Sequence, residues 1–263
     1  MLRHITKFQE LLILNCNSLK LQRLKHTEQK IKVGNININY IQTGEGPKSL
    51  LLMPGTLGTA WTDFKPQIEQ LPKLLPNYTI IAWDPPGYGK SIPPKRHFCP
   101  KVFQNDARTA LDLMIALERP KFSILGWSAG GITGLAIAGG CGRQNVERLV
   151  VWGNGAYLNK VELNSFRAIR DVNKWSAGMR EPLEKVYGKQ RFAELWSEWV
   201  DIMGEIYEKH DGDFCRQEVE NISAPTLIIR GKLDAIIDPD MVAYLTERIK
   251  GHRWEMAIFI INK

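Results

Sequence analysis

The sequence predicts an α/β fold in which helices cover both faces of a mostly parallel sheet. Short apolar runs without alternation are typical of strands buried on both faces. Six such runs follow residue 31: Leu50–Met53, Ile80–Trp83, Phe122–Leu125, Leu149–Trp152, Thr226–Ile229 and Trp254–Ile261. Apolar residues at helical spacing occupy three of the intervals, Phe64–Leu74, Phe103–Leu117 and Gly131–Ala138. Strands that alternate with helices build a parallel sheet, because each crossover returns the chain to the same end.

Two further patterns complete this domain, which we assign to residues 31–263. Ile36, Ile38 and Tyr40 alternate with asparagines, which predicts a half-buried strand. The alternation of strands and helices stops for about 70 residues between Trp152 and Pro225, where tryptophans stand on helical patterns. We therefore expect a helical cap over about residues 157–220, above the carboxyl ends of the strands, where ligands bind in open α/β sheets.

Composition narrows the function classes. Of the 263 residues, 44% are hydrophobic and 24% are charged, as in ordinary globular chains and unlike disordered ones. No apolar run approaches the ~18 residues that span a bilayer, so we expect no stable membrane insertion. The four cysteines lie far apart without a C-x-x-C pair, which argues against a zinc site. No basic cluster or nucleic-acid motif is visible. We expect a monomer that takes a small-molecule substrate, with no metal, cofactor or nucleic acid.

The first 30 residues form a basic segment. They contain six lysines and arginines against two glutamates, so +6 − 2 = +4 of the net charge of +7 lies there. Apolar pairs and triplets at helical spacing accompany these charges. Such a cationic amphipathic segment is typical of a mitochondrial presequence. The alternative is a surface helix or a frayed terminus of a cytoplasmic protein.

The motif that carries chemistry is Gly126–Gly130, with the sequence GWSAG. It follows one predicted strand and precedes a helix of small residues, which is the setting of a nucleophile elbow. The glycines are needed because the turn is so tight that side chains there would collide with neighbouring backbone. The turn lifts the Ser128 hydroxyl clear of the sheet, at a helix N-terminus that favours developing negative charge. We expect Ser128 to be a catalytic nucleophile.

An acyl-transfer site also needs two donors for an oxyanion and an acid that orients a histidine. The N–H of Ala129, directly after the nucleophile, is the first donor. The second is the N–H of Thr56, in the loop after the strand Leu50–Met53. The alternative interpretation of this loop is a plain Pro-Gly turn without a catalytic role. In this fold the acid follows a later strand. Asp234 has that position and Asp238 is the alternative, although an aspartate before Pro239 is also a common helix N-cap.

These residues resemble one family. The stretches that carry the resemblance are Tyr40–Gly46, Leu51–Gly58, Trp83–Ser91, Gly126–Ile132 and Ile169–Ser176. Together they are similar to the valacyclovir hydrolase (biphenyl hydrolase-like) family, mitochondrial serine hydrolases with the α/β-hydrolase fold. The resemblance runs from about residue 31 to 256 and includes the cap. It implies hydrolysis of α-amino-acid esters, with Ser128 as nucleophile and Asp234 as acid.

Two positions depart from the family pattern. The family carries an aspartate directly after the nucleophile, where it pairs with the substrate's α-amino group, and this chain has Ala129. The family's histidine lies in a loop after the last strand, near Ile261–Lys263, and none stands there. The five histidines are His4, His26, His97, His210 and His252. Of these, only His252 follows Asp234, and it lies before the predicted last strand. Eight residues of strand span about 26 Å, beyond hydrogen-bond reach of Ser128.

These departures from the family pattern leave two alternative predictions about activity. The sequence predicts a C-terminally truncated α/β-hydrolase fold and a serine esterase that is impaired by the lack of the triad histidine. The alternative is a truncated isoform or a non-catalytic binding module that keeps the hydrolase cavity. An epoxide hydrolase or dehalogenase is disfavoured, because those enzymes use aspartate at the elbow where this chain has Ser128.

Overall fold

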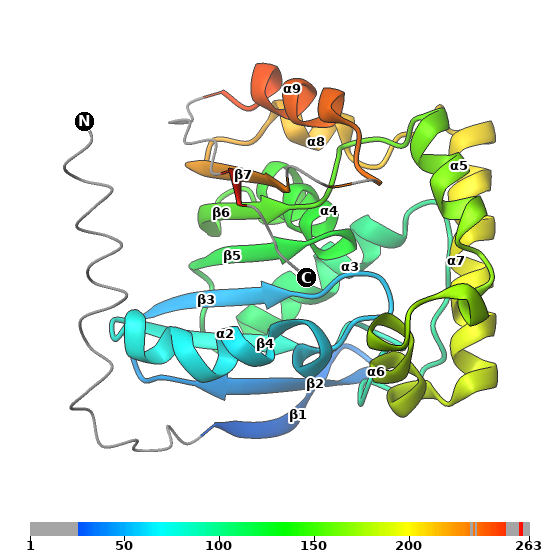
Figure 1. Ribbon diagram of the computed structural model, residues 1–263. Coiled ribbons are helices and arrows are strands. Elements are labelled where there is room, and N and C mark those ends of the chain that lie inside the picture. Colours follow the sequence, from blue (N-terminus) through cyan, green and yellow to red (C-terminus); the bar gives the residue numbers. More distant parts are fainter. Residues whose placement is uncertain (1–25, 232–233, 235, 251–257, 260–263) are drawn as a thin grey trace.

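We analysed a computed structural model of the chain, which describes residues 26–231, 234, 236–250 and 258–259. An eight-stranded sheet runs through its centre in the order β1-β2-β4-β3-β5-β6-β7-β8 (Figure 1). The strands are β1 (Thr27–Val33), β2 (Ile36–Thr43), β3 (Lys48–Met53), β4 (Tyr78–Trp83), β5 (Phe122–Trp127), β6 (Val146–Trp152), β7 (Thr226–Gly231) and β8 (Ile258–Phe259). Strands β3 to β8 are parallel, while β2 pairs antiparallel with both β1 and β4. The predicted fold class is confirmed.

The continuous apolar runs form the central strands because both faces of the sheet are covered there. In β4, Ile80, Ile81 and Ala82 are all fully buried, so side chains on both faces of this strand lack solvent contact. Leu51 and Leu52 in β3 are likewise fully buried. A run that alternated apolar with polar residues would place polar groups in one of these two layers of core.

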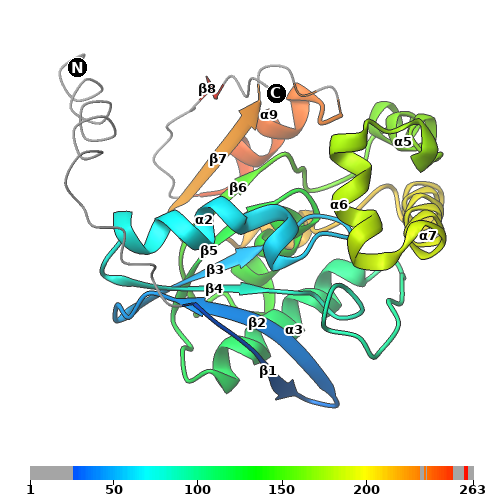
Figure 2. The same ribbon diagram turned by 60° about the horizontal axis from the view of Figure 1, so that its bottom comes forward.

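Helices cover both faces of the sheet. Helix α2 (Ala60–Leu74) lies over one face, where Phe64 and Ile68 contribute to a small core above β2, β3 and β4. On the opposite face lie α3 (Val102–Ala116), α4 (Ala129–Ala136), α8 (Arg216–Glu220) and α9 (Pro239–Arg248) (Figure 2). A π-helical turn over Ile137–Cys141 extends α4. The larger core lies on this second face.

A group of helices stands between β6 and β7 in the chain and lies beyond the carboxyl ends of the strands (Figure 1). It comprises α5 (Lys160–Ala168), a 3₁₀ turn at Val172–Lys174, α6 (Ala177–Tyr187) and α7 (Lys189–Lys209). The indoles of Trp175 and Trp196 both donate to the carbonyl of Ile169, at 2.8 and 2.9 Å. The aromatic cluster therefore fixes the connection after α5 against α7. No helix in the described part of the chain is both long and apolar enough to cross a bilayer.

Two boundaries differ from the expectation or fall outside the described residues. Strand β1 begins at Thr27, so residues 27–30 belong to the sheet and the domain starts earlier than residue 31. Its polar side chains are exposed at the edge of the sheet, which is why no apolar pattern marked it. Within the predicted strand Trp254–Ile261, only Ile258–Phe259 is described, and it pairs with β7. Residues 1–25 and the expected truncation lie outside the described residues.

Candidate active site

Ser128 lies on a sharp turn between β5 and α4. Its backbone has φ 53° and ψ −124°, a conformation that residues with side chains adopt only under strain. Two backbone hydrogen bonds hold the turn: the Ser128 N–H donates to Trp152 at 2.9 Å, and its carbonyl accepts from Gly131 at 2.8 Å. The side chain is half-buried. The hydroxyl therefore stands at the N-terminus of α4, where free N–H groups and the helix dipole favour negative charge.

The glycines on each side of Ser128 are required by contact with backbone. A Cβ on Gly130 would collide with the carbonyl oxygen of Met53, at the end of β3. A Cβ on Gly126 would lie 2.7 Å from the carbonyl oxygen of Gly130. Both positions are well inside van der Waals contact, so any larger residue must displace the turn. The packing reason for the GWSAG pattern is thus present in the structure, while the role of Ser128 as nucleophile stays a prediction.

The loop Pro54–Gly58 follows β3 and faces the turn. A Cβ on Gly55 would lie 3.2 Å from the Cβ of Ser128, so the two backbones are in close approach. Thr56 and Ala129 line the same cavity as Ser128. Among the hydrogen bonds of the described residues, none uses the backbone N–H of Thr56 or of Ala129. Both donors thus remain available to an oxyanion, although that role is also still a prediction.

Asp63, in the first turn of α2, fixes the shape of this loop. Its Oδ2 accepts from the N–H of Gly55 at 2.9 Å, and its Oδ1 accepts from the Thr62 hydroxyl at 2.8 Å. The loop also folds over the carboxyl so closely that a Cβ on Gly58 would collide with Oδ2. Burial raises the pKa of Asp63 to about 6. No pattern in the sequence singles this residue out, because an acidic residue in a first helical turn is common.

The helices α5, α6 and α7, which we call the cap, contact the loop after β3 through one tyrosine. The Tyr187 hydroxyl, at the end of α6, donates to the carbonyl of Leu57 at 2.8 Å. It accepts from the N–H of Gly89 at 3.2 Å. Leu57 itself is fully buried and has a left-handed φ of 61°. One side chain therefore ties α6 to the loop after β3 and to the loop after β4, and it closes the cap over this end of the sheet.

Asp234 follows β7 and comes close to the elbow region. Its Oδ1 accepts from the N–H groups of Ile236 and Ile237, each at 3.0 Å. Its Oδ2 lies 4.0 Å from the position of a Cβ on Gly153, and the indole Nε1 of Trp127 lies 3.4 Å from that position. Asp234 and the residue before Ser128 thus approach the same glycine. The role of Asp234 as the acid of a triad stays a prediction.

Asp238, the alternative acid, is occupied as a helix cap. Its Oδ1 accepts from the N–H of Asp240 at 3.0 Å, in the first turn of α9. Its Oδ2 accepts from the Asn159 side chain at 3.0 Å. Both oxygens therefore hold α9 and the start of α5, as expected for an aspartate before Pro239.

Three of the five histidines are described, and none of these three lines the cavity at Ser128. His26 packs edge-on against Trp61, with ring centroids 5.1 Å apart, at the start of β1. His210 ends α7, and His97 lies in the loop between β4 and α3. His4 and His252 lie outside the described residues. Among the positions that it describes, the structure therefore brings no histidine to the cavity at Ser128.

The cavity at Ser128 has a polar end and an apolar wall. The polar end adds Asn154 and Glu162 to Ser128 and Thr56. The wall is formed by side chains of α4, the cap and the loops beside it: Ile132, Tyr157, Leu158, Phe166, Trp199, Met203, Phe214 and Ile237. The cavity offers about 30 Å³ to water-sized molecules, room for a few waters but not for an ester.

Sequence reasoning missed Asn154 and Glu162. Glu162 stands three residues after Asn159, a spacing that marks a capping box, and the box is present: the Asn159 side chain accepts from the Glu162 N–H at 2.8 Å. That pattern predicts the start of a helix and says nothing about a cavity. Only the fold of the chain brings this carboxyl to the cavity that Ser128 also lines.

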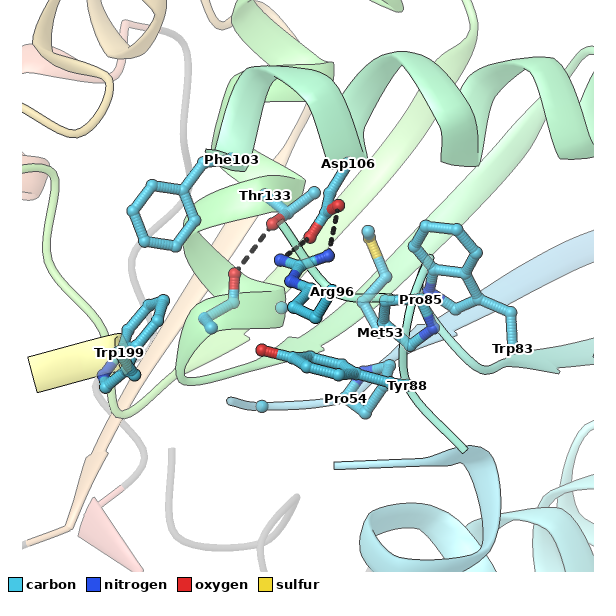
Figure 3. Close-up of a pocket in the computed structure, with 13 residues that line it drawn as sticks. Met53, Pro54, Trp83, Pro85, Tyr88, Arg96, Phe103, Asp106, Thr133 and Trp199 are labelled. Atoms are coloured by element: carbon cyan, nitrogen blue, oxygen red, sulfur yellow. Dashed lines mark hydrogen bonds and ion pairs between the residues drawn. The ribbon is translucent and has the colours of Figure 1, made fainter. Parts of the chain in front are cut away.

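A buried ion pair lines a second cavity beside the elbow (Figure 3). Arg96 and Asp106 pair at 2.7 Å with little exposure of either side chain. The ring of Tyr88 lies against the guanidinium, with 4.4 Å between the Arg96 Cζ and the ring centroid. Thr133 donates to the carbonyl of Ala129 at 2.9 Å, within α4. Arg96 and Asp106 line this second cavity together with Ala129 and Gly130 of the elbow, so this ion pair lies close to the turn.

Comparisons with known proteins agree with this architecture. The model of the alpha/beta hydrolase family matches residues 50–259. The serine hydrolase BPHL of Homo sapiens is 41% identical over 227 residues, covering 86% of this chain and 77% of that protein. The Mus musculus protein is 39% identical with the same coverage. Among solved structures, the 2-hydroxy-6-oxo-6-phenylhexa-2,4-dienoate hydrolase of Rhodococcus sp. strain RHA1 has a TM-score of 0.71 at 18% identity, covering 90% of this chain and 91% of that one. The chain belongs to the alpha/beta hydrolase family and, within it, to the group of serine hydrolases that contains BPHL.

Proposed function

We propose that this chain hydrolyses carboxylic esters through an acyl-enzyme on Ser128. The observation that carries the proposal is the strained turn at Ser128, which lines one cavity with Thr56 and Ala129, whose N–H groups form no hydrogen bond with the described residues. The hydroxyl oxygen attacks the ester carbonyl, and the N–H groups of Thr56 and Ala129 hold the oxyanion. The alcohol leaves, and water then attacks the acyl-enzyme and releases the acid. Membership of a serine hydrolase group supports this reaction type.

We infer that the chain as it stands turns over slowly. A serine hydroxyl needs a base at neutral pH, and none of the described histidines lines the cavity. In a well-studied serine protease, loss of the histidine costs about a millionfold in kcat and leaves about 10³–10⁴-fold over water. With the base absent, the oxyanion donors and the binding cavity alone would supply the remaining rate.

The substrate class follows from the resemblance and from the cavity. The family hydrolyses α-amino-acid esters, and the apolar wall with Trp199, Met203 and Phe166 suits an ester that carries a hydrophobic group. Ala129 removes the carboxylate that the family uses next to the nucleophile. Compared with amine esters, esters without an amine therefore lose less binding free energy here than in the family, unless another carboxyl binds the amine.

A labelling experiment tests the reaction. The chain is incubated with a fluorophosphonate probe, and hydrolysis of an aryl acetate is followed in parallel, with Ser128→Ala as the control. We expect slow labelling and slow hydrolysis that both disappear in the control. Labelling that persists in Ser128→Ala would refute the assignment of the nucleophile.

A non-catalytic binding module is the second candidate, favoured by the absence of a histidine from the cavity lining among the described residues. It predicts neither labelling nor hydrolysis, together with measurable binding of esters in the cavity. The two candidates thus separate in a single set of assays.

For location, we propose that residues 1–25 direct the chain to mitochondria. They contain five basic residues and one glutamate, so +5 − 1 = +4, and they precede β1, the first described strand, which begins at Thr27. The test compares the full chain with a variant that lacks residues 2–25, each fused at the C-terminus to a fluorescent protein. We expect mitochondrial fluorescence from the full chain alone. The same distribution of both fusions in the cell would contradict the proposed location.

A further inference from the structure

Glu162 is a buried carboxyl whose hydrogen bonds leave part of its capacity unused. It is only 2% exposed. One oxygen accepts from the N–H of Asn159 and the other from the N–H of Asp238, each at 3.3 Å, beyond the usual range for N–H···O bonds. A carboxylate can accept about four hydrogen bonds. Glu162 therefore retains acceptor capacity toward the cavity that it lines together with Ser128.

Within the described part of the chain, the charged groups that act most strongly on Glu162 are carboxyls. Asp238 and Asp234 both face it, and burial together with these two aspartates raises the pKa of Glu162 to about 7. Among the described residues, no ion pair involves any of the three carboxyls. Arg230 donates to the carbonyl of Ile237 at 3.3 Å instead. This end of the cavity thus carries negative charge that a cation would stabilise.

Asn154 provides an independent indication of a ligand. Its side chain is 4% exposed, yet neither Oδ1 nor Nδ2 has a partner within the described part of the chain. It lines the same cavity as Glu162 and Ser128. A buried amide without partners costs free energy unless a ligand or water completes it. The carbonyl of this amide offers a second acceptor to a group bound between it and Glu162.

We propose that Glu162 and Asn154 bind a protonated amine of the substrate while its ester carbonyl lies at Ser128. This inference rests on the proposed ester hydrolysis and deepens it, since it names the charge of the substrate. An ammonium group has three donors, which suits the carboxylate and the amide oxygen. The carboxylate that binds the ammonium group thus belongs to helix α5 of the cap and not to position 129. The apolar wall receives the hydrophobic part of the same ester.

Two matched pairs of benzyl esters test the proposal. The 2-aminopropanoate ester is compared with the 2-methylpropanoate ester, and the 3-aminopropanoate ester with the butanoate ester, so that only an ammonium replaces a methyl group. Binding is measured by titration calorimetry at pH 8 on the full chain with Ser128→Ala, which prevents turnover. In at least one pair we expect the amine ester to bind about ten- to a hundredfold more tightly, as for a charge-assisted hydrogen bond.

Two further variants assign the effect. Glu162→Gln keeps the capping box, because glutamine also serves at this position, and should reduce the preference to less than about threefold. Glu181→Gln removes an exposed carboxyl on α6 away from the cavity and should leave the preference unchanged. Amine esters that bind no more tightly than their isosteres in both pairs overturn the proposal, as does a preference that survives Glu162→Gln. Fluorophosphonate labelling of the unmodified chain tests the nucleophile separately, so failure of the reaction and failure of amine binding give different results.

Discussion

Asp63 should make the protein more stable in mild acid than at neutral pH. Its pKa is about 6 in the folded chain against 3.8 for an ordinary aspartate, because burial disfavours the charged form. Folding thus favours the protonated carboxyl, and the folded state binds more protons than the unfolded state between these two pH values. The free energy of unfolding therefore falls as pH rises through this window. The folded and unfolded pKa values differ by about two, and at about 1.36 kcal/mol per pH unit the total loss is about 3 kcal/mol.

Asp63→Asn isolates this contribution. The amide is neutral at every pH, and its oxygen can still accept from the Gly55 N–H that Asp63 holds at 2.9 Å. Between pH 5 and pH 7.5, the carboxyl should cost the unmodified chain about 1.4 kcal/mol that the variant does not lose. Urea unfolding of both proteins at a series of pH values measures the difference. Glu162 in the cavity also has a raised pKa, but it titrates in both proteins and cancels. Asp84 interacts with Asp63, so Asp84→Asn in both backgrounds is the control that removes its contribution.

The measured quantity is the pH dependence of the difference in unfolding free energy between the two proteins, so it does not depend on the absolute stability of either protein. The free energy of unfolding of Asp63→Asn, relative to the unmodified chain, should rise by about 1.4 kcal/mol across this pH range. A difference that stays constant would show that Asp63 titrates normally. A difference that falls would show that the ionised carboxyl stabilises the loop, and the assignment of burial as the dominant cause would be wrong.

Three further changes test the elbow, the cap and the substrate. Gly130→Ala drives a Cβ into the Met53 carbonyl and should lower the free energy of unfolding by about 3 kcal/mol or more. The control is Gly178→Ala, where an added Cβ has nothing within 4 Å. In the same urea titration, this control should raise the free energy of unfolding by about 0.5–1 kcal/mol. Tyr187→Phe leaves the Gly89 N–H without its partner and should cost about 1–3 kcal/mol; an unchanged rate of fluorophosphonate labelling would mean that this contact does not position the loop after β3. Ala129→Asp should increase the preference for amine-bearing esters about ten- to a hundredfold in the calorimetric comparison, and equal preference would show that position 129 does not reach the amine.

The sheet and the elbow could be predicted because their reasons are local. Ile80, Ile81 and Ala82 form a run without alternation, and only a strand covered on both faces buries such a run completely. The turn at Ser128 could be placed because its two glycines stand at the positions where backbone would collide with a Cβ. Strand β1 was missed, since its exposed edge position removes the apolar pattern on which strand prediction depends.

The functional groups around Ser128 were harder to predict, because their positions depend on packing between distant segments. Asp63 looks like an ordinary first-turn acid until the loop after β3 folds over it. Glu162 looks like the second half of a capping box and fills that role, and the same carboxyl also lines the cavity. A residue with two roles shows only its local role in the sequence. The expectation that Ser128 lacks a base depends in part on residues outside those described, so it stays a prediction.

Placing charge recognition on the cap has a consequence for how binding and closure are coupled. Ser128 lies on the turn after β5, whereas Glu162 belongs to α5, so a substrate that contacts both joins the cap to the rest of the domain. The cavity has room for a few waters only, so under the proposed function the cap would open to admit an ester and close to bring Glu162 to the amine. An ester without an amine gains nothing from that closure at Glu162. Its binding energy is therefore lost at the step that expels water and orients the carbonyl, which lowers kcat as well as affinity.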